Sequence, residues 1–205
     1  MFISDLPPGE KWQNYELKAL SLRDFARVSA NRALDPFSLA RYANLIVVSI
    51  DQVEGLSDSA RRHLLGAAVD EWSGGACSLP NGAKLVVLNR QHPRTRTNAT
   101  LMEEICHVFL GHKPNRLSVV VRDERGKHLN RDYRKADEEA AYAVGAACLV
   151  PFKPLRRFVY PRKTSADIAR HFRVSRDLVE YRIKVTRLWP DYRSRLAAHK
   201  QIDEK

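Results

Sequence analysis

Apolar residues recur along the chain at two spacings, one typical of helices and the other of strands. The helical spacing predicts helices over residues 12–30, 37–43, 57–72, 95–110 and 136–150. Short aliphatic, β-branched runs predict strands at 45–50 and 83–88, and the run at 117–122 is a further strand candidate. Gly74 and Gly75 are expected to break the chain after a helix, and the polar stretch 123–134 to form a loop. Several helices with a few short strands indicate an α+β fold with a small sheet.

Residues 165–179 have the pattern of two short helices joined by a tight turn. Ser175 is placed to cap the second helix. The apolar positions would form one shared seam, made of Ile168, Ala169, Phe172, Val174, Leu178 and Val179. This spacing is typical of a helix-turn-helix, but plain helical hairpins share it, and Arg173 stands where the turn usually has glycine.

Positive charge is concentrated in the C-terminal quarter of the chain. The formal net charge is +11, and residues 151–200 carry fourteen Lys or Arg residues against four Asp or Glu residues. Such a local excess suggests contact with nucleic acid or with an acidic protein. A solubilising surface explains it equally well, so DNA contact through this region is one hypothesis of two.

Length and cysteine content indicate a compact protein of a reducing compartment. The 205 residues suffice for one domain with a core and a small addition. We expect an N-terminal helical segment (1–34), a central domain (35–151) and a basic helical region (152–205).

The most apolar stretches are too short to span a bilayer, and the N-terminus lacks the apolar core of a secretory signal. Three cysteines without paired spacing fit the cytoplasm, so we expect a cytoplasmic protein with no membrane partner.

The predicted helix 95–110 carries the candidate chemistry, because it contains Glu103, Glu104 and His107. Residues four apart share one face of a helix. In HExxH proteins this spacing puts two histidines on one metal ion, and the Glu after the first histidine is the general base. Here Glu103 occupies the first histidine position, and a carboxylate can also ligate zinc. A third ligand is expected from Glu138 or Glu139 at the start of the helix 136–150.

Each of these residues also has an ordinary structural explanation. A single histidine among apolar residues is often a hydrogen-bonded core residue, and paired glutamates often face solvent. Acidic residues at the start of a helix are favoured by the helix dipole. The two motifs in this order, rather than any one residue, indicate a metal site.

The second helix reads EEAAYAVGAACLVP over residues 138–151. Together with EEICH at 103–107, it resembles the ImmA/IrrE family of intracellular metallopeptidases, in which an HExxH helix precedes a helix reading ExxANxFAAxLLxP. This sequence departs from the family pattern at Tyr142 and Val144. It matches the pattern at Glu138, Ala141, Ala146, Leu149 and Pro151. The segment 85–89, Arg94 and Arg96 also look like the family, and the resemblance covers roughly residues 35–189.

The resemblance implies a zincin-like metallopeptidase domain followed by a basic, helix-turn-helix-like C-terminal region. It implies Glu103, His107 and Glu138 as metal ligands, Glu104 as the general base, and Zn²⁺ as the cofactor. Proteins of this family commonly cleave or disable a helix-turn-helix repressor in stress responses or mobile-element control. The implied partner is therefore a protein substrate that regulates transcription.

Glu103 gives a harder ligand set than two histidines and one glutamate, which also admits Mn²⁺ or Fe²⁺. Additional site candidates are His112, His128 and Glu139. On an ideal helix, His112 would point about 140° away from His107. Gly111 could end the helix and let His112 turn back toward the metal.

The sequence leaves functions of different classes open. One is a metal-dependent endopeptidase that cleaves a repressor through a metal-activated water, with Glu104 as the base. The alternative is a catalytically inactive relative that acts as a DNA-binding or partner-binding regulator. A module that only sequesters its partner belongs with this alternative.

Overall fold

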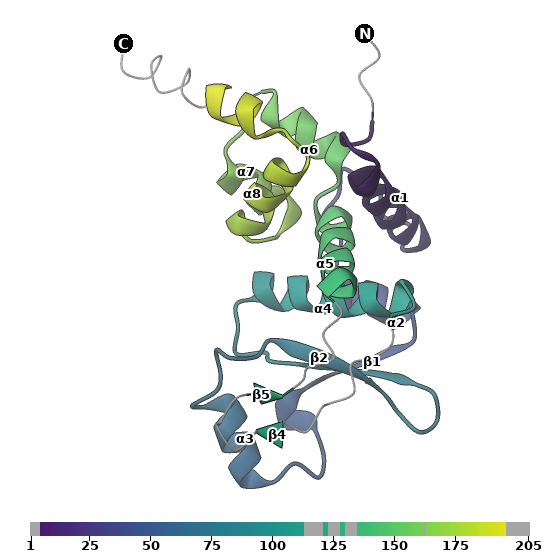
Figure 1. Ribbon diagram of the computed structural model, residues 1–205, viewed down its shortest axis with the longest axis vertical. Coiled ribbons are helices and arrows are strands. Elements are labelled where there is room, and N and C mark those ends of the chain that lie inside the picture. Colours follow the sequence, from purple (N-terminus) through teal and green to yellow (C-terminus); the bar gives the residue numbers. More distant parts are fainter. Residues whose placement is uncertain (1–4, 113–120, 123–127, 130–134, 162, 196–205) are drawn as a thin grey trace. The chain divides into compact units, whose positions relative to one another are not determined.

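Figure 1 shows the computed structural model, which describes residues 5–112, 121–122, 128–129, 135–161 and 163–195. The chain forms two compact units, one from residues 1–36 and 143–205 and the other from residues 37–142. Helices and a small sheet make the α+β fold that the sequence predicts. The predicted division into three domains stays a prediction. No helix within the described ranges is both long and apolar enough to cross a membrane.

A three-stranded sheet lies in the unit formed by residues 37–142. Its strand order is β1 (Leu45–Ser49), β3 (Lys84–Leu88), β2 (Gly74–Ser78). β1 runs parallel to β3, whereas β2 runs antiparallel to it. The central strand is the most buried, because Val86 and Leu88 have no exposed surface. Both strands predicted from the sequence are confirmed, and so is the helix before them, α2 (Pro36–Tyr42).

The strand β2 was not predicted, because it begins at the two glycines expected only to break the chain. An ideal Cβ on Gly74 would lie 2.8 Å from Cγ2 of Thr100 and 3.0 Å from Cδ2 of Leu88. Thr100 belongs to α4 (Arg94–Phe109), which packs against β2 and β3 (Figure 1). A Cβ at position 74 would therefore be too close to this helix and to the neighbouring strand, and glycine avoids that contact.

The helix predicted at 57–72 is shorter than expected. It is α3 (Asp58–Leu65), and its start is confirmed because the Ser57 hydroxyl accepts a hydrogen bond from the amide of Ala60 at 3.2 Å. The predicted end is wrong. Gly66 closes the helix, and the indole of Trp72 folds back to donate to the Leu64 carbonyl at 2.9 Å. An ideal Cβ at position 66 would lie 2.7 Å from the Arg62 carbonyl oxygen, so glycine fits the end of this helix, which the apolar spacing does not indicate.

Two short strands, β4 (Val121–Arg122) and β5 (His128–Leu129), pair in an antiparallel manner. β4 agrees with the last two residues of the strand predicted at 117–122. β5 contradicts the loop predicted at 123–134, because its two residues pair with β4. The rest of these two segments lies outside the described residues.

The other unit is built from helices. These are α1 (Glu10–Phe25), the second half of α5 (Lys135–Leu149), α6 (Phe152–Val159), α7 (Ser165–Phe172) and α8 (Arg176–Val185), with a further helical segment at 189–195. α5 confirms the helix predicted at 136–150. The helix predicted at 12–30 ends earlier, at Phe25, because Arg27 takes a positive φ of 53° that cannot continue a helix.

α7 and α8 form the predicted pair of short helices. The hydroxyls of Thr164 and Ser175 cap their N-termini by accepting from the amides of Asp167 and Leu178. The turn residue Arg173 has φ 57° and ψ 42°, the left-handed conformation for which a helix-turn-helix usually employs glycine. The apolar seam is buried as expected.

A buried ion pair joins α1 and α8. The Arg182 guanidinium donates to Oε2 of Glu16 at 2.5 Å, and both side chains are 1% exposed. Glu16 also accepts from the amide of Phe152 at 2.6 Å, and Arg182 donates to the Val150 carbonyl at 3.0 Å. The pair therefore provides hydrogen-bond partners for two buried backbone groups between α5 and α6.

Replacing Arg182 with Met is expected to lower the free energy of unfolding by about 3–5 kcal/mol, because it leaves the Glu16 carboxylate buried without its cation. The measurement is urea unfolding followed by circular dichroism.

The matched control is Arg157→Met, an exposed arginine of α6, for which a change within about 0.5 kcal/mol is expected. Equal effects of the two substitutions would contradict a structural role for the buried pair.

Candidate metal centre

Helix α4 places Glu103 and His107 one turn apart on the same face. The opposite face is apolar, and its residues Leu101, Met102, Ile105 and Cys106 are at most 2% exposed. This buried face fixes the rotation of the helix about its axis. The glutamates and the histidine are consequently directed away from the core and are only partly buried.

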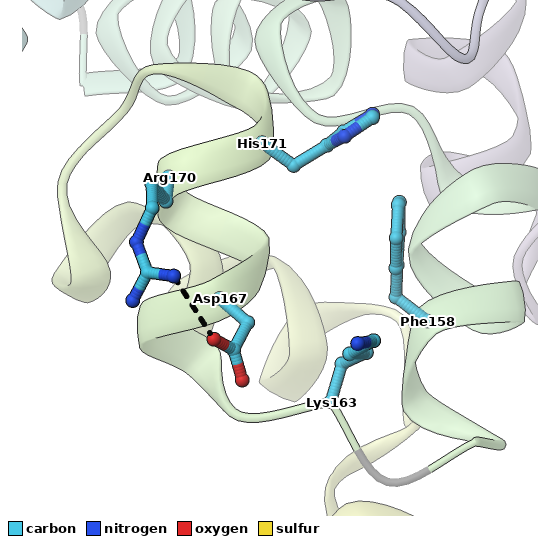
Figure 2. A pocket seen from close by; sticks show the side chains of 5 residues that line it. All are labelled: Phe158, Lys163, Asp167, Arg170 and His171. Carbon is cyan, nitrogen blue, oxygen red and sulfur yellow. Dashed lines mark ion pairs between the residues drawn. The ribbon is translucent and has the colours of Figure 1, made fainter.

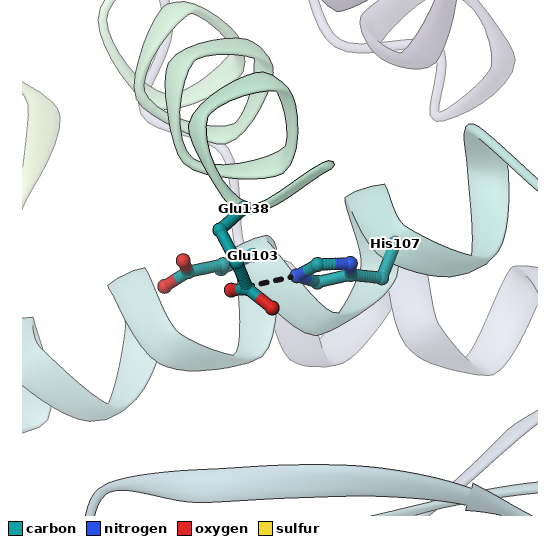
Figure 3. A group of neighbouring side chains, drawn as sticks. All are labelled: Glu103, His107 and Glu138. Atoms are coloured by element: carbon teal, nitrogen blue, oxygen red, sulfur yellow. Dashed lines mark ion pairs between the residues drawn. The ribbon is translucent and has the colours of Figure 1, made fainter. Parts of the chain in front are cut away.

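The first turn of α5 brings a third donor to the same place. Glu103, His107 and Glu138 each offer one ligand atom, and these atoms lie within 4.8 Å of one another (Figure 3). Nε2 of His107 lies 3.4 Å from Oε2 of Glu138. Two donors on one tetrahedral zinc ion, each about 2.1 Å from it, are also about 3.4 Å apart. This pair of donors thus has the spacing expected at a small divalent cation.

The carboxyl groups of this cluster are held in unfavourable surroundings for negative charge. Burial, and then the charge of Glu138, raise the pKa of Glu103 to about 7. Burial raises the pKa of Glu104 to about 7 as well, with smaller contributions from Glu103 and Glu138. Without a cation, these groups would share protons near neutral pH.

The donor chemistry fits a divalent cation. Neither Glu103 nor Glu104 has a hydrogen-bond or ion-pair partner among the described residues. Partly buried carboxylates are normally paired with a cation or with hydrogen-bond donors. A divalent ion bound between Glu103, His107 and Glu138 would provide that compensation.

The structure places the additional candidates differently. Gly111 has a φ of 70°, and the chain turns back so that Nδ1 of His112 lies 3.0 Å from Nδ1 of His107. His112 is therefore beside the cluster but outside the three-donor group. Glu139 is exposed on α5. His128 lies on β5, opposite Arg122, and its role stays a prediction.

Asp137 is a neighbour of the cluster that the sequence did not single out. Its Oδ1 lies 3.8 Å from Nε2 of His112. The signal available in the sequence was only an acidic residue directly before Glu138, which helix starts carry for other reasons. The position of His112 had to be known before Asp137 could be noticed.

The model of the IrrE N-terminal-like domain, a peptidase M78 family, matches residues 63–184, which is more than half of the chain. The chain belongs to this family. The matched segment contains α4, α5, α7 and all but the last residue of α8, and it confirms the resemblance to ImmA/IrrE proteins. A search of curated proteins found no significant match.

The helical unit of this family member also carries a surface pocket of about 310 Å³ (Figure 2). Its lining residues are Phe158, Lys163, Asp167, Arg170 and His171. A guanidinium nitrogen of Arg170 lies 3.4 Å from Oδ1 of Asp167. The ring centroids of Phe158 and His171 are 4.7 Å apart. Because its basic side chains are exposed to solvent, we assign the pocket to the basic surface rather than to a ligand site.

In protein stripped of metal by EDTA, Glu104→Gln is expected to raise the free energy of unfolding at pH 8 and to change it little at pH 5. The pKa of Glu104 is raised from 4.5 to about 7. A raised pKa favours the folded state at low pH, and this advantage is lost as the pH rises through 7. At about 1.4 kcal/mol per pKa unit, the penalty of the parent at pH 8 approaches about 3 kcal/mol.

Urea unfolding at both pH values measures the difference, with the exposed Glu71→Gln as the matched control. A Glu104→Gln variant that is less stable than the parent at pH 8 would show that the ionised Glu104 carboxylate does not destabilise the folded state.

Proposed function

We propose that the chain is a metal-dependent endopeptidase in which Glu103, His107 and Glu138 bind the metal and Glu104 is the general base. The observation that carries the proposal is the convergence of three donors, from two helices, within 4.8 Å. The chain's membership of a peptidase family supports the same proposal.

The reaction is the hydrolysis of a peptide bond by water. A divalent cation held by the cluster would polarise the peptide carbonyl and increase the acidity of the attacking water. Glu104 follows Glu103 directly in α4, which is the position of the general base in HExxH proteins. Its carboxylate takes the proton from water, and the resulting carboxylic acid donates a proton to the leaving amine.

Zn²⁺ is the proposed cofactor, with Mn²⁺ or Fe²⁺ as alternatives. Two of the three donors are carboxylates, which are harder ligands than imidazole and also suit Mn²⁺ and Fe²⁺. An extra anionic ligand weakens the pull of the cation on water. The chain therefore depends more on a base such as Glu104 than a site with two histidines does.

The proposed substrate is a regulator protein, such as a helix-turn-helix repressor that controls stress responses. This proposal comes from the family resemblance. Cys77, Cys106 and Cys148 are free cysteines, which fits a reducing compartment such as the cytoplasm.

A second candidate function is binding of DNA or of a partner protein by the α7–α8 pair, without cleavage. The observation that favours it is the left-handed turn at Arg173 between two capped helices. Arg170, Arg173 and Lys184 are exposed on this pair. Basic residues on such a surface bind phosphates irrespective of sequence.

The first candidate is tested by metal content and cleavage together. Glu104→Gln is expected to keep about one equivalent of metal and to lose about 10²–10⁴-fold in cleavage rate, because glutamine cannot accept a proton. Glu103→Ala, His107→Ala and Glu138→Ala are expected to lose both metal and cleavage. The measurements are elemental analysis of the full chain and mass spectrometry of a peptide library incubated with it, with an EDTA-treated blank.

Glu71→Gln serves as the control for removal of a glutamate in the same unit. Cleavage by Glu104→Gln at the parental rate would exclude Glu104 as the base. A parent that binds no metal after supplementation would overturn the peptidase proposal.

The second candidate is tested with the full chain, because Glu16 of α1 completes the helical unit. A gel shift with duplex DNA is expected to weaken steeply with salt, and Arg170→Ala with Arg173→Gly to reduce the slope of log K against log salt by about two. Arg62→Ala, an exposed arginine of the other unit, is the control. Binding that is absent or indifferent to salt would exclude phosphate contacts.

A further inference from the structure

His112 links the metal cluster to a carboxylate that the proposed reaction does not use. Its Nδ1 lies 3.0 Å from Nδ1 of His107, and its Nε2 lies 3.8 Å from Oδ1 of Asp137. The two imidazole rings meet edge to face, with centroids 5.1 Å apart and an interplanar angle of 69°. The His107 ring thus has the Glu138 carboxylate at one nitrogen and His112 at the other.

Two ring nitrogens at 3.0 Å must share one proton. Two lone pairs at this distance would repel, and two N–H groups would clash, so one ring donates and the other accepts. The nitrogen that faces Glu138 and the cluster is Nε2 of His107. A nitrogen that ligates a metal has no proton, so the proton of His107 belongs on Nδ1.

This assignment fixes the state of the second ring. If Nδ1 of His107 donates, Nδ1 of His112 accepts, and the proton of His112 lies on Nε2. That N–H faces Asp137, at a distance longer than a direct hydrogen bond but suited to electrostatic attraction. The hydrogen bond between the two rings therefore leaves the remaining N–H of His112 near the negative charge of Asp137.

We propose that His112, supported by Asp137, is a positioning residue that holds His107 as its Nδ1–H tautomer and directs Nε2 toward the metal. The inference rests on the proposed metal site. Metal-binding histidines usually donate their other N–H to a carboxylate, carbonyl or water. In this chain an imidazole is the acceptor, and the carboxylate lies one residue further away.

The same geometry argues against His112 as a fourth ligand. A ligand would direct a ring nitrogen at the space between Glu103, His107 and Glu138. Nδ1 of His112 instead faces the nitrogen of His107 opposite to the one near Glu138, and Nε2 faces Asp137. Neither nitrogen belongs to the three-donor group.

The first test is zinc affinity of the full chain, measured by competition with a chromogenic chelator. His112→Ala is expected to keep one zinc equivalent and to bind it about 10–100-fold more weakly, as for other losses of a residue that supports a ligand. His112→Asn is expected to restore most of the affinity, because its side-chain oxygen replaces the accepting nitrogen. Asp137→Ala is expected to weaken binding less than His112→Ala.

His63→Ala, an exposed histidine of the same unit, is the matched control, and the unfolding midpoint of each variant shows whether it is folded. Unchanged zinc affinity in a folded His112→Ala variant would overturn the proposal. Failure of asparagine to restore affinity in a folded variant would also overturn it, because a merely structural histidine predicts that result.

The second test reads the tautomer directly. In the zinc-loaded chain with ¹⁵N-labelled histidine, long-range ¹H–¹⁵N spectra are expected to show His107 protonated at Nδ1 and coordinated at Nε2. Coordination through Nδ1, or a zinc signature on His112 itself, would overturn the positioning role while leaving the metal site intact. A parent that binds no zinc, manganese or iron would overturn this inference and the proposed function together.

Discussion

The burial of neighbouring carboxyl groups is the constraint on which the rest of the site depends. Glu103, Glu104 and Glu138 lie close together in partly buried surroundings, and burial together with the neighbouring negative charge raises the pKa of Glu103 and that of Glu104 to about 7. The apolar face of α4 holds two of them there, because rotating the helix would expose Leu101 and Ile105 to water. The core therefore imposes a concentration of negative charge that a divalent cation relieves.

Replacement of the first motif histidine by Glu103 shifts the balance between holding a cation and activating water. Carboxylates attract the cation more strongly, but they also neutralise part of the charge that makes a bound cation a Lewis acid. In the proposed reaction, the neighbouring Glu104 would then have a larger share of the proton transfer. A cation held by Glu103 in place of a histidine would therefore be bound more tightly but would be a weaker Lewis acid.

Local patterns made much of the fold and the spacing of the site predictable. α4 and α5 follow from helical periodicity, β1 and β3 from β-branched runs, and the α7–α8 pair from its apolar seam. The four-residue spacing on α4 selected Glu103 and His107, and the first turn of α5 offered Glu138 or Glu139, between which the family resemblance chose Glu138. Contacts between distant residues were not predictable. β2 depends on the approach of Thr100 to Gly74, and Asp137 becomes relevant only after Gly111 has turned His112 back.

The ion pair between Glu16 and Arg182 has a consequence for the order in which parts of the chain can fold during synthesis. The helical unit draws on both the first 36 residues and those after residue 142, so the sheet-containing unit interrupts it in sequence. During synthesis the sheet and α4 emerge long before Arg182 does. Until Arg182 has been synthesised, Glu16 of α1 lacks the cation that compensates its charge in the buried position. The part of the chain synthesised first is therefore among the last to reach its final structure.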